Sequence, residues 1–155
     1  IARATSFTTT ALARAAIVEL MEGDALVVEL AAIAAYMDEV RPPPPRPLEA
    51  ARRQAGRAVF EREAVGCATC HPAPQYADGR RHAVLSASAD ADGVLAEVDT
   101  PTLRGVRARP PFGHDGRAAS LAELLTTHNG GDTHGRTSAL SPAELELLLD
   151  YLESL

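Results

Sequence analysis

The sequence contains no lysine and no tryptophan, and it has only three tyrosines and three phenylalanines among its 155 residues. A core made largely of Ala, Leu and Val is thin, which leaves room for a large non-protein hydrophobic group inside the fold. All 15 basic residues are arginine, and the net charge of -6 argues against nucleic acid as a partner. With 46% hydrophobic residues, the chain is an ordinary globular protein rather than a disordered one.

Long apolar runs are also missing. The longest candidate, residues 25–37, is shorter than the roughly 20 residues of a membrane span and includes Glu29. The first residues lack the basic and apolar regions of a signal peptide. Because the chain begins at Ile1, we expect either a processed product or a piece of a longer protein, and the motifs below favour the second.

Two helices are expected in the first 40 residues, over residues 11–21 and 25–40. The second has an apolar stripe at helical spacing: Leu26, Leu30, Ile33 and Met37. Residues 41–47 then read Arg-Pro-Pro-Pro-Pro-Arg-Pro, which ends the helix and favours stiff polyproline II. We therefore predict a helical segment over residues 1–40, a proline-rich linker over 41–47 and a separate domain over 48–155.

Three further helices are expected, over residues 48–65, 121–128 and 142–155. Ser120 is a suitable N-cap for the second of them. Ser141 begins the third with a capping pattern, because Pro and Glu follow at the first and third helical positions. No stretch alternates as a strand does, so the predicted fold class is all-α.

One helix pattern occurs twice. Residues 29–37 align with residues 144–152, and Glu, Leu and Tyr coincide at matching places. Chance among helices rich in Leu and Ala is one explanation. The alternative is that residues 1–40 are the tail of a preceding, similar domain.

The motif with the clearest chemistry is Cys67-Ala-Thr-Cys70-His71, which is typical of covalent attachment of c-type haem. Two thiols about one helical turn apart reach the two vinyl groups of one porphyrin, and the adjacent imidazole binds the iron. A thioredoxin-like CxxC would need a βαβ setting, and structural zinc would need four ligands. Both cysteines of the chain lie in this one motif, which makes a chance match improbable.

The surroundings fit a cytochrome. Cytochrome c domains cross their first and last helices closely, with a Gly and an aromatic residue on the first and an aromatic residue on the last. Gly56, Phe60 and Tyr151 match that arrangement. An ordinary aromatic core pair is the alternative.

Several ordered motifs then resemble the bacterial di-haem cytochrome c peroxidase and MauG superfamily. They are Thr-Pro-Thr-Leu-Arg-Gly at residues 100–105, Pro-Pro-Phe-Gly-His-Asp-Gly at 110–116, and Ser-Leu-Ala-Glu at 120–123. The resemblance covers about residues 48–155 and matches the second, C-terminal haem domain of that family. It implies a cytochrome c-like helical fold around one covalent haem.

The resemblance also implies an iron ligand opposite His71. The peroxidases place a Met there and MauG-like members a Tyr, but this sequence has no Met after Met37. Counting from His114 to the family's position leads to His128, which we predict as the second axial ligand. His114 is expected to form hydrogen bonds near the haem, and Arg104 to neutralise a haem propionate.

Other ligands are less favoured. His134 lies in a Gly-rich loop and His82 in a polar loop, where we expect a solvated side chain. The family holds a calcium ion between its two haem domains, near the segment that matches Thr100 and Pro101. Without the partner domain, we do not expect calcium here.

Three functions are compatible with these features. The first is a mono-haem electron-transfer domain with bis-His iron, which exchanges electrons with a redox partner protein or a second haem domain. The second is the electron-supplying domain or subunit of a di-haem, peroxidase-like oxidoreductase, so whether the chain is part of an enzyme stays open. A haem sensor or an oxygenase-like site with open iron is the third. Covalent haem attachment occurs outside the cytoplasm, so we expect a periplasmic or exported protein.

Overall fold

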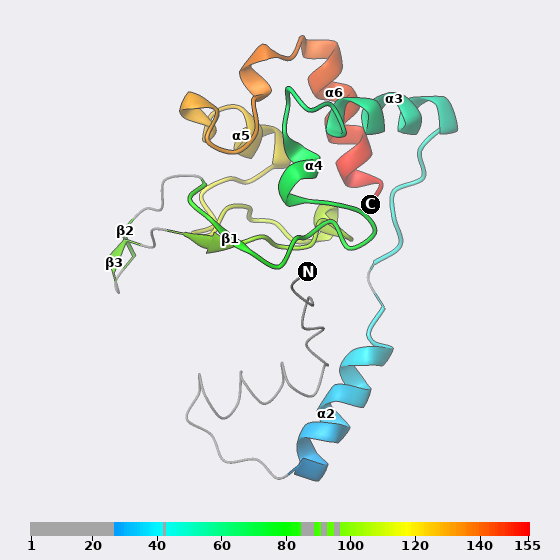
Figure 1. Cartoon of the computed structure of the whole chain (residues 1–155). Helices are drawn as coiled ribbons and strands as arrows, with labels where there is room; N and C mark the ends of the chain where they lie inside the picture. The colour runs from blue at the N-terminus through cyan, green and yellow to red at the C-terminus, as the bar shows by residue number, and fades with distance from the viewer. Residues whose placement is uncertain (1–26, 42, 85–88, 91–92, 95–96) are drawn as a thin grey trace, which may run out of the picture. The chain divides into compact units, whose positions relative to one another are not determined.

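The computed structural model describes residues 27–41, 43–84, 89–90, 93–94 and 97–155 (Figure 1). The chain divides into two compact units, residues 1–42 and residues 43–155. Among the described residues, no helix has the length and apolar character that crossing a membrane requires.

In the first unit, helix α2 (Val27–Glu39) agrees with the helix expected over residues 25–40. The apolar stripe is only partly right. Leu30 is buried, but its buried neighbour one turn on is Ala34, while Ile33 and Met37 are exposed. The small side chain of Ala34 was not counted as part of the apolar face, which shifted the predicted stripe. The helix predicted over residues 11–21 lies outside the described residues.

The second unit contains four described α-helices and three described short 3-10 helices. The α-helices are α3 (Ala50–Phe60), α4 (Cys67–Cys70), α5 (Leu121–Leu125) and α6 (Pro142–Glu153). The 3-10 helices are η2 (Val106–Ala108), η3 (Gly130–Asp132) and η4 (Thr137–Ala139). The predicted starts at Ser120 and Ser141 are confirmed, because each hydroxyl accepts a hydrogen bond from the third residue of its helix. The predicted ends are too late, since α3 stops at Phe60 and α5 at Leu125.

The all-α prediction needs a correction. The unit is mostly helical, but it also contains the antiparallel pair β1 (Arg81–His82) with β4 (Val98–Asp99), and β2 (Ala89–Asp90) with β3 (Gly93–Val94). Strands of two residues are too short for the apolar alternation by which a strand is recognised in a sequence. The first pair nonetheless matters, because it closes the loop between residues 82 and 98 beside the cavity described below.

Helices α3 and α6 cross in close contact, as predicted (Figure 1). A Cβ atom added to Gly56 would lie 2.2 Å from the Leu147 carbonyl oxygen and 2.7 Å from the Tyr151 Cβ. Only glycine therefore fits at this crossing. One turn later, the buried Phe60 ring packs against the Tyr151 ring with 5.4 Å between their centroids.

Residues 43–49 are not helical, as the prolines require. Within the second unit, this segment is tied to α6 by Arg46. Its guanidinium donates to Asp150 Oδ1 at 2.9 Å and to Glu153 Oε2 at 2.8 Å. Because these groups are partly exposed, the pairs position the segment more than they stabilise it.

The hydrophobic core lies beneath the α3–α6 crossing. Its buried members come from α3, η2, α5 and α6: Val59, Phe60, Val106, Leu121, Leu125, Leu148, Tyr151 and Leu152. Several of these side chains also line the cavity of the candidate site. The same side chains therefore belong to the hydrophobic core and to the lining of the candidate site.

Candidate haem site

A cavity of about 640 Å³ opens into the second unit. That volume lies within the roughly 300–1,000 Å³ of small-molecule and cofactor sites. Apolar side chains make up much of its wall: Phe60, Leu103, Val106, Leu121, Leu124, Leu125 and Leu152. Cys67, Cys70, His71 and His134 also line it. The cavity therefore combines an apolar body with thiol and imidazole groups.

The two cysteines sit at the two ends of the single-turn helix α4. Gly66, with φ of 85°, turns the chain sharply from the loop after α3 into this helix. Both thiols are free, and burial raises the pKa of the Cys67 thiol to about 11. In the chain without a bound group, Cys67 is therefore a protonated thiol at neutral pH.

His71 follows α4 and is buried. Its Nδ1 lies 2.8 Å from the Tyr76 carbonyl oxygen, to which it donates when the proton is on that nitrogen. Burial lowers the pKa of His71, which favours the neutral ring. This arrangement leaves Nε2 as the nitrogen with a lone pair for a metal.

The carbonyl that orients His71 belongs to Tyr76, five residues further along the chain. Tyr76 has a positive φ of 54°, which turns its carbonyl back toward His71. Its hydroxyl lies 3.1 Å from the Tyr151 hydroxyl of α6. The position of His71 is thereby tied to the α3–α6 crossing.

The second imidazole of the cavity belongs to His134. Its ring centroid lies 6.3 Å from that of His71, with 61° between the ring planes. Its Nδ1 is buried and has no hydrogen-bonding partner among the described residues. Burial lowers the pKa of His134 to about 4, so the ring is neutral at physiological pH, as a metal ligand must be.

The buried side chain of Asn129 holds the His134 loop. Its Nδ2 donates to the Gly135 carbonyl at 2.9 Å and to Thr137 Oγ1 at 2.8 Å, while its Oδ1 accepts from the His134 N–H at 2.8 Å. The Arg136 N–H donates to the Val65 carbonyl, which ties the loop to the segment before Cys67. The Gly-rich loop that contains His134 is thus held by hydrogen bonds at several points.

His128 does not line the cavity. It follows α5 in a turn, and its Nε2 lies 3.2 Å from Glu123 Oε1. The structure therefore does not bring the predicted second ligand to His71, and it brings His134 there instead. Helix α5 ends at Leu125, three residues before His128, so the helix expected over residues 121–128 does not reach this histidine.

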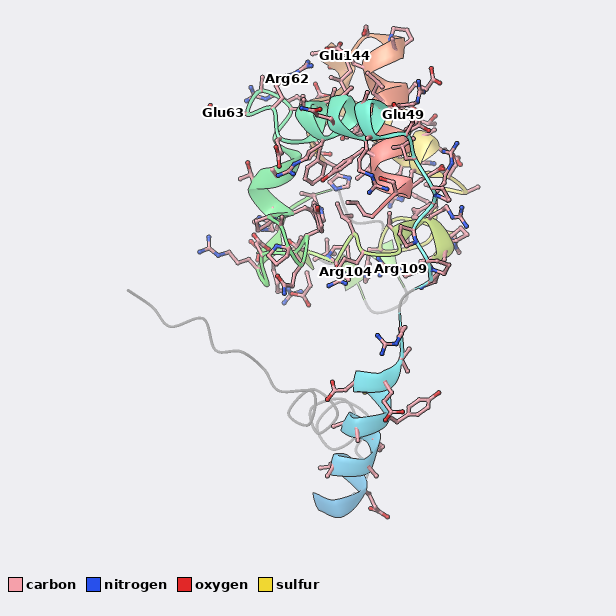
Figure 2. The ribbon with its side chains drawn as sticks, turned by 90° about the vertical axis from the view of Figure 1, so that its right-hand side faces the viewer. Glu49, Arg62, Glu63, Arg104, Arg109 and Glu144 are labelled. Carbon is pink, nitrogen blue, oxygen red and sulfur yellow. The ribbon has the colours of Figure 1, made fainter. Side chains whose placement is uncertain are left out.

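Some of the other predicted site residues line the cavity and others lie outside it. Phe60 and His114 line the cavity, although His114 is otherwise exposed. His82 also lines it and lies with its Nε2 2.7 Å from Asp78 Oδ2, so it is more than a solvated surface residue. Arg104 is exposed and outside the lining, whereas Arg109 is part of it. Figure 2 shows these two arginines close together, at the end of the unit away from α3.

The sequence pattern favours His128 over His134 and gives no role to Asn129, whereas the structure places His134 beside His71. The only signal was the pair of glycines around His134, Gly131 and Gly135, which have positive φ values of 75° and 76°. Such glycines permit the sharp turns that aim His134 inward. Nothing in the sequence pattern identifies the hydrogen bonds of Asn129.

These residues fit a covalently attached haem. A metal between two imidazoles, each bound at about 2.0–2.1 Å as is usual for histidine, spaces the ring centres about 6 Å apart. The 6.3 Å between His71 and His134 agrees with that spacing. The two free thiols beside His71 and the apolar walls complete the set of groups that haem c requires.

Comparisons with known proteins agree with this picture. The chain matches no protein-family model. It is 32% identical to hydrazine synthase subunit gamma of Kuenenia stuttgartiensis over an alignment of 143 residues, which covers 66% of this chain and 40% of that subunit. Among solved structures, it resembles Kuenenia stuttgartiensis hydrazine synthase pressurised with xenon, with a TM-score of 0.69, 26% identity, and 86% of this chain and 56% of that one covered.

A second solved structure is a MauG-like protein associated with microbial copper homeostasis. The TM-score is 0.61 at 18% identity, and the match covers 86% of this chain and 58% of that one. At this identity the likeness concerns the fold alone. Together, the similarities indicate a fold that the chain shares with hydrazine synthase and with a MauG-like protein. The chain spans less than two thirds of the length of each protein it matches.

Proposed function

We propose that the chain is a c-type cytochrome unit that transfers electrons through one covalent haem, held by Cys67 and Cys70 and ligated by His71 and His134. The observation that carries the proposal is the pair of imidazoles of His71 and His134, whose ring centroids lie 6.3 Å apart on the lining of one largely apolar cavity, next to two free thiols. The bound group supplies the one-electron chemistry at its iron.

The residues of this chain do the rest. Cys67 and Cys70 anchor the porphyrin from one side of α4. The bond from His71 Nδ1 to the Tyr76 carbonyl fixes the tautomer and raises the basicity of the ligating nitrogen. Asn129 fixes the loop that presents His134. His71 and His134 would together hold the iron from two sides, which would leave no coordination position for a substrate and favours electron transfer over oxygen or peroxide chemistry.

Bis-imidazole ligation also lowers the reduction potential relative to His/Met ligation. The partner that exchanges electrons is a redox protein or a second haem domain. Since haem is attached to cysteines outside the cytoplasm, we place this function in the periplasm or outside the cell.

A second candidate function is the haem unit of a larger oxidoreductase. The observation that favours it is the 32% identity with a hydrazine synthase subunit, which is part of an enzyme. In that setting this chain would supply or receive electrons for a reaction at another haem. The chemistry of the unit itself is the same in both cases, so the two candidates differ in the partner and not in the site.

The test is low-temperature EPR spectroscopy of the ferric protein. We expect a low-spin signal of the bis-imidazole type in the wild-type protein. His134→Ala removes one of the two axial nitrogens and should convert the iron to high spin. His128→Ala is the matched control, because this histidine lies outside the cavity lining, and it should leave the spectrum unchanged.

Two results would contradict the proposal. A high-spin signal in the wild-type protein would mean an open axial position and would favour the peroxidase-like alternative. A low-spin signal that survives His134→Ala but is lost in His128→Ala would return the ligand to His128 and require the loop after α5 to rearrange.

A further inference from the structure

Residues 103–109, which include η2, lie between the cavity and solvent. The backbone N–H groups at positions 106 and 109 donate to the carbonyls three residues earlier, each at 3.1 Å. In such a winding, side chains three positions apart lie on the same face. The lining of the cavity accordingly includes Leu103, Val106 and Arg109, whereas Arg104 and Arg107 are exposed and outside it. The segment thus has an inner face toward the cavity and an outer face with two arginines.

The outer face carries positive charge that no carboxylate neutralises among the described residues. Elsewhere in the unit, four arginines in or near α3 each pair with a carboxylate: Arg46, Arg52, Arg57 and Arg62. Arg104 and Arg107 belong to no ion pair within the described part of the chain. Two like charges one turn apart repel each other, and an anionic surface laid against them turns this repulsion into attraction.

The backbone of this segment is fixed by hydrogen bonds. The Arg109 guanidinium donates to the Thr102 carbonyl and, at 3.3 Å, to the Arg104 carbonyl. The Gly105 N–H donates to the Leu155 carbonyl at 2.9 Å, which ties the segment to the residues after α6. Because the outer face is presented by an ordered backbone, a partner that binds there pays little for ordering it.

We propose that the outer face of residues 103–109, defined as Arg104 and Arg107, docks an acidic surface of the redox partner. The inference rests on the proposed function, because it needs a haem in the cavity. Electron transfer slows steeply with distance, and the inner face of the same segment lines the cavity, so a partner docked here lies close to the bound group. The net charge of the chain is -6, so an acidic partner is repelled by the molecule as a whole and attracted at this face.

The test uses the haem-loaded protein in its ferrous form and two inorganic oxidants of opposite charge. One electron passes from the protein to the anion hexacyanoferrate(III), which becomes hexacyanoferrate(II), or to the cation tris(phenanthroline)cobalt(III), which becomes the cobalt(II) complex. Stopped-flow spectroscopy gives the second-order rate constant at a series of salt concentrations. We expect the rate constant for the anion to fall as salt is added, because salt screens the attraction to the outer face. A protein that acted through its net charge alone would show the opposite trend.

A pair of double variants assigns the attraction to its residues. Arg104→Gln combined with Arg107→Gln should lower the rate constant for hexacyanoferrate(III) at low salt about tenfold, and the rate constant for the cobalt cation should not fall. Arg57→Gln combined with Arg62→Gln is the matched control, because it removes the same charge from exposed positions in and beside α3. This control should change the rate constant for the anion far less. The low-spin EPR signal should be the same in both double variants, which shows that the haem site is intact.

Polyglutamate tests docking of an acidic polypeptide rather than attraction of a small anion. When it covers the outer face, it should slow the reaction with hexacyanoferrate(III) in the wild-type protein and in the Arg57→Gln, Arg62→Gln control. It should have no effect on the protein with Arg104→Gln and Arg107→Gln, because the charges that bind it are gone.

Three outcomes would overturn the inference. A wild-type rate constant for hexacyanoferrate(III) that rises with salt would mean that the net charge, and not the outer face, governs the approach. Slowing by phosphatidylglycerol vesicles but not by polyglutamate would mean that the face binds a membrane surface. Both of these results leave the proposed function intact. If the ferrous protein reacted with neither oxidant, electron transfer itself would be refuted, and the proposed function would fail together with the inference.

Discussion

At the scale of single residues, Asn129 determines where His134 lies. One buried amide binds the loop at the His134 N–H, the Gly135 carbonyl and the Thr137 hydroxyl. The Thr137 hydroxyl in turn donates to the Leu125 carbonyl at 2.6 Å, which connects the loop to the end of α5. The partly exposed Asp132 carboxylate also bridges the loop, through the Ser138 N–H, but the Asn129 amide is the buried group that binds the His134 backbone itself.

Asn129→Ala should therefore loosen His134 without touching it. The variant leaves a buried N–H, carbonyl and hydroxyl without their partner, and each such loss costs about 1–3 kcal/mol. We expect an unfolding free energy lower by at least that amount and a partly high-spin ferric EPR signal. Thr127→Ala, at an exposed position two residues before Asn129, should change neither. An Asn129→Ala protein with an unchanged spectrum would show that His134 is held by other contacts.

At this scale the sequence identifies groups that are neighbours along the chain. Cys67, Cys70 and His71 are separated by only a few residues, and the structure places all three on the lining of the cavity. The second imidazole depends on a loop whose path is set by buried hydrogen bonds between residues several positions apart. Such bonds leave no periodic pattern, so the sequence does not show that His134, rather than His128, lies beside His71.

At the scale of elements, the α3–α6 crossing determines the shape of the unit. Gly56→Ala should lower the unfolding free energy, since the new methyl group would overlap the backbone of Leu147. Overpacking typically costs about 1–3 kcal/mol, more than the roughly 1 kcal/mol that Ala gains over Gly in a helix. Chemical denaturation measures the difference, and Gln54→Ala on the exposed face of α3 is the control. An equal or higher stability of Gly56→Ala would mean that the helices can separate without loss.

The start of α6 gives a pH-dependent prediction. The Glu144 carboxylate accepts from the Ser141 N–H and hydroxyl and pairs with Arg62, and these contacts lower the pKa of Glu144 from 4.5 to about 2. Figure 2 shows Glu144 and Arg62 at the same end of the unit. Because the pKa is lower in the folded state, the contribution of Glu144 to stability is complete above about pH 4.5 and is lost as the pH falls toward 2.

Urea denaturation of the wild-type protein and of Glu144→Gln tests this. The variant should be less stable at pH 6, and the difference should shrink as the pH falls below 4.5. Glu63→Gln serves as control, because Glu63 lies in the neighbouring turn and makes no ion pair among the described residues. If the difference in unfolding free energy between the wild-type protein and Glu144→Gln stayed constant with pH, the effect would come from packing and not from the charge of Glu144.

Helix starts were predicted better than helix ends. Ser120 and Ser141 mark the starts of their helices, because each hydroxyl accepts a hydrogen bond from the backbone N–H three residues further on. The ends of α3 and α5 have no comparable marker, since Arg62 and Thr126 are compatible with a helix. The chain turns there because the following segments must reach the cavity, which is a tertiary requirement.

At the scale of the whole molecule, the core is incomplete without a bound group. Phe60, Val106 and Leu152 belong to the core cluster and also face the cavity. Empty apolar cavities destabilise proteins in proportion to their size, and one of about 640 Å³ is large for a unit of this length. The small number of aromatic residues in the sequence points in the same direction. A large bound group would fill the volume that aromatic side chains fill in other cores.

Cys67→Ala combined with Cys70→Ala should consequently leave a poorly folded chain. Without the thioether bonds, the porphyrin cannot be retained covalently, and the side chains around the cavity lose their largest contact. We expect reduced helical circular dichroism and no cooperative thermal transition. Thr69→Ala, an exposed change between the two cysteines, should retain both the haem and the transition. The double variant could instead keep native-like helicity and a cooperative transition. That result would mean that residues 43–155 fold around their own side chains and that the haem does not contribute to the stability of the core.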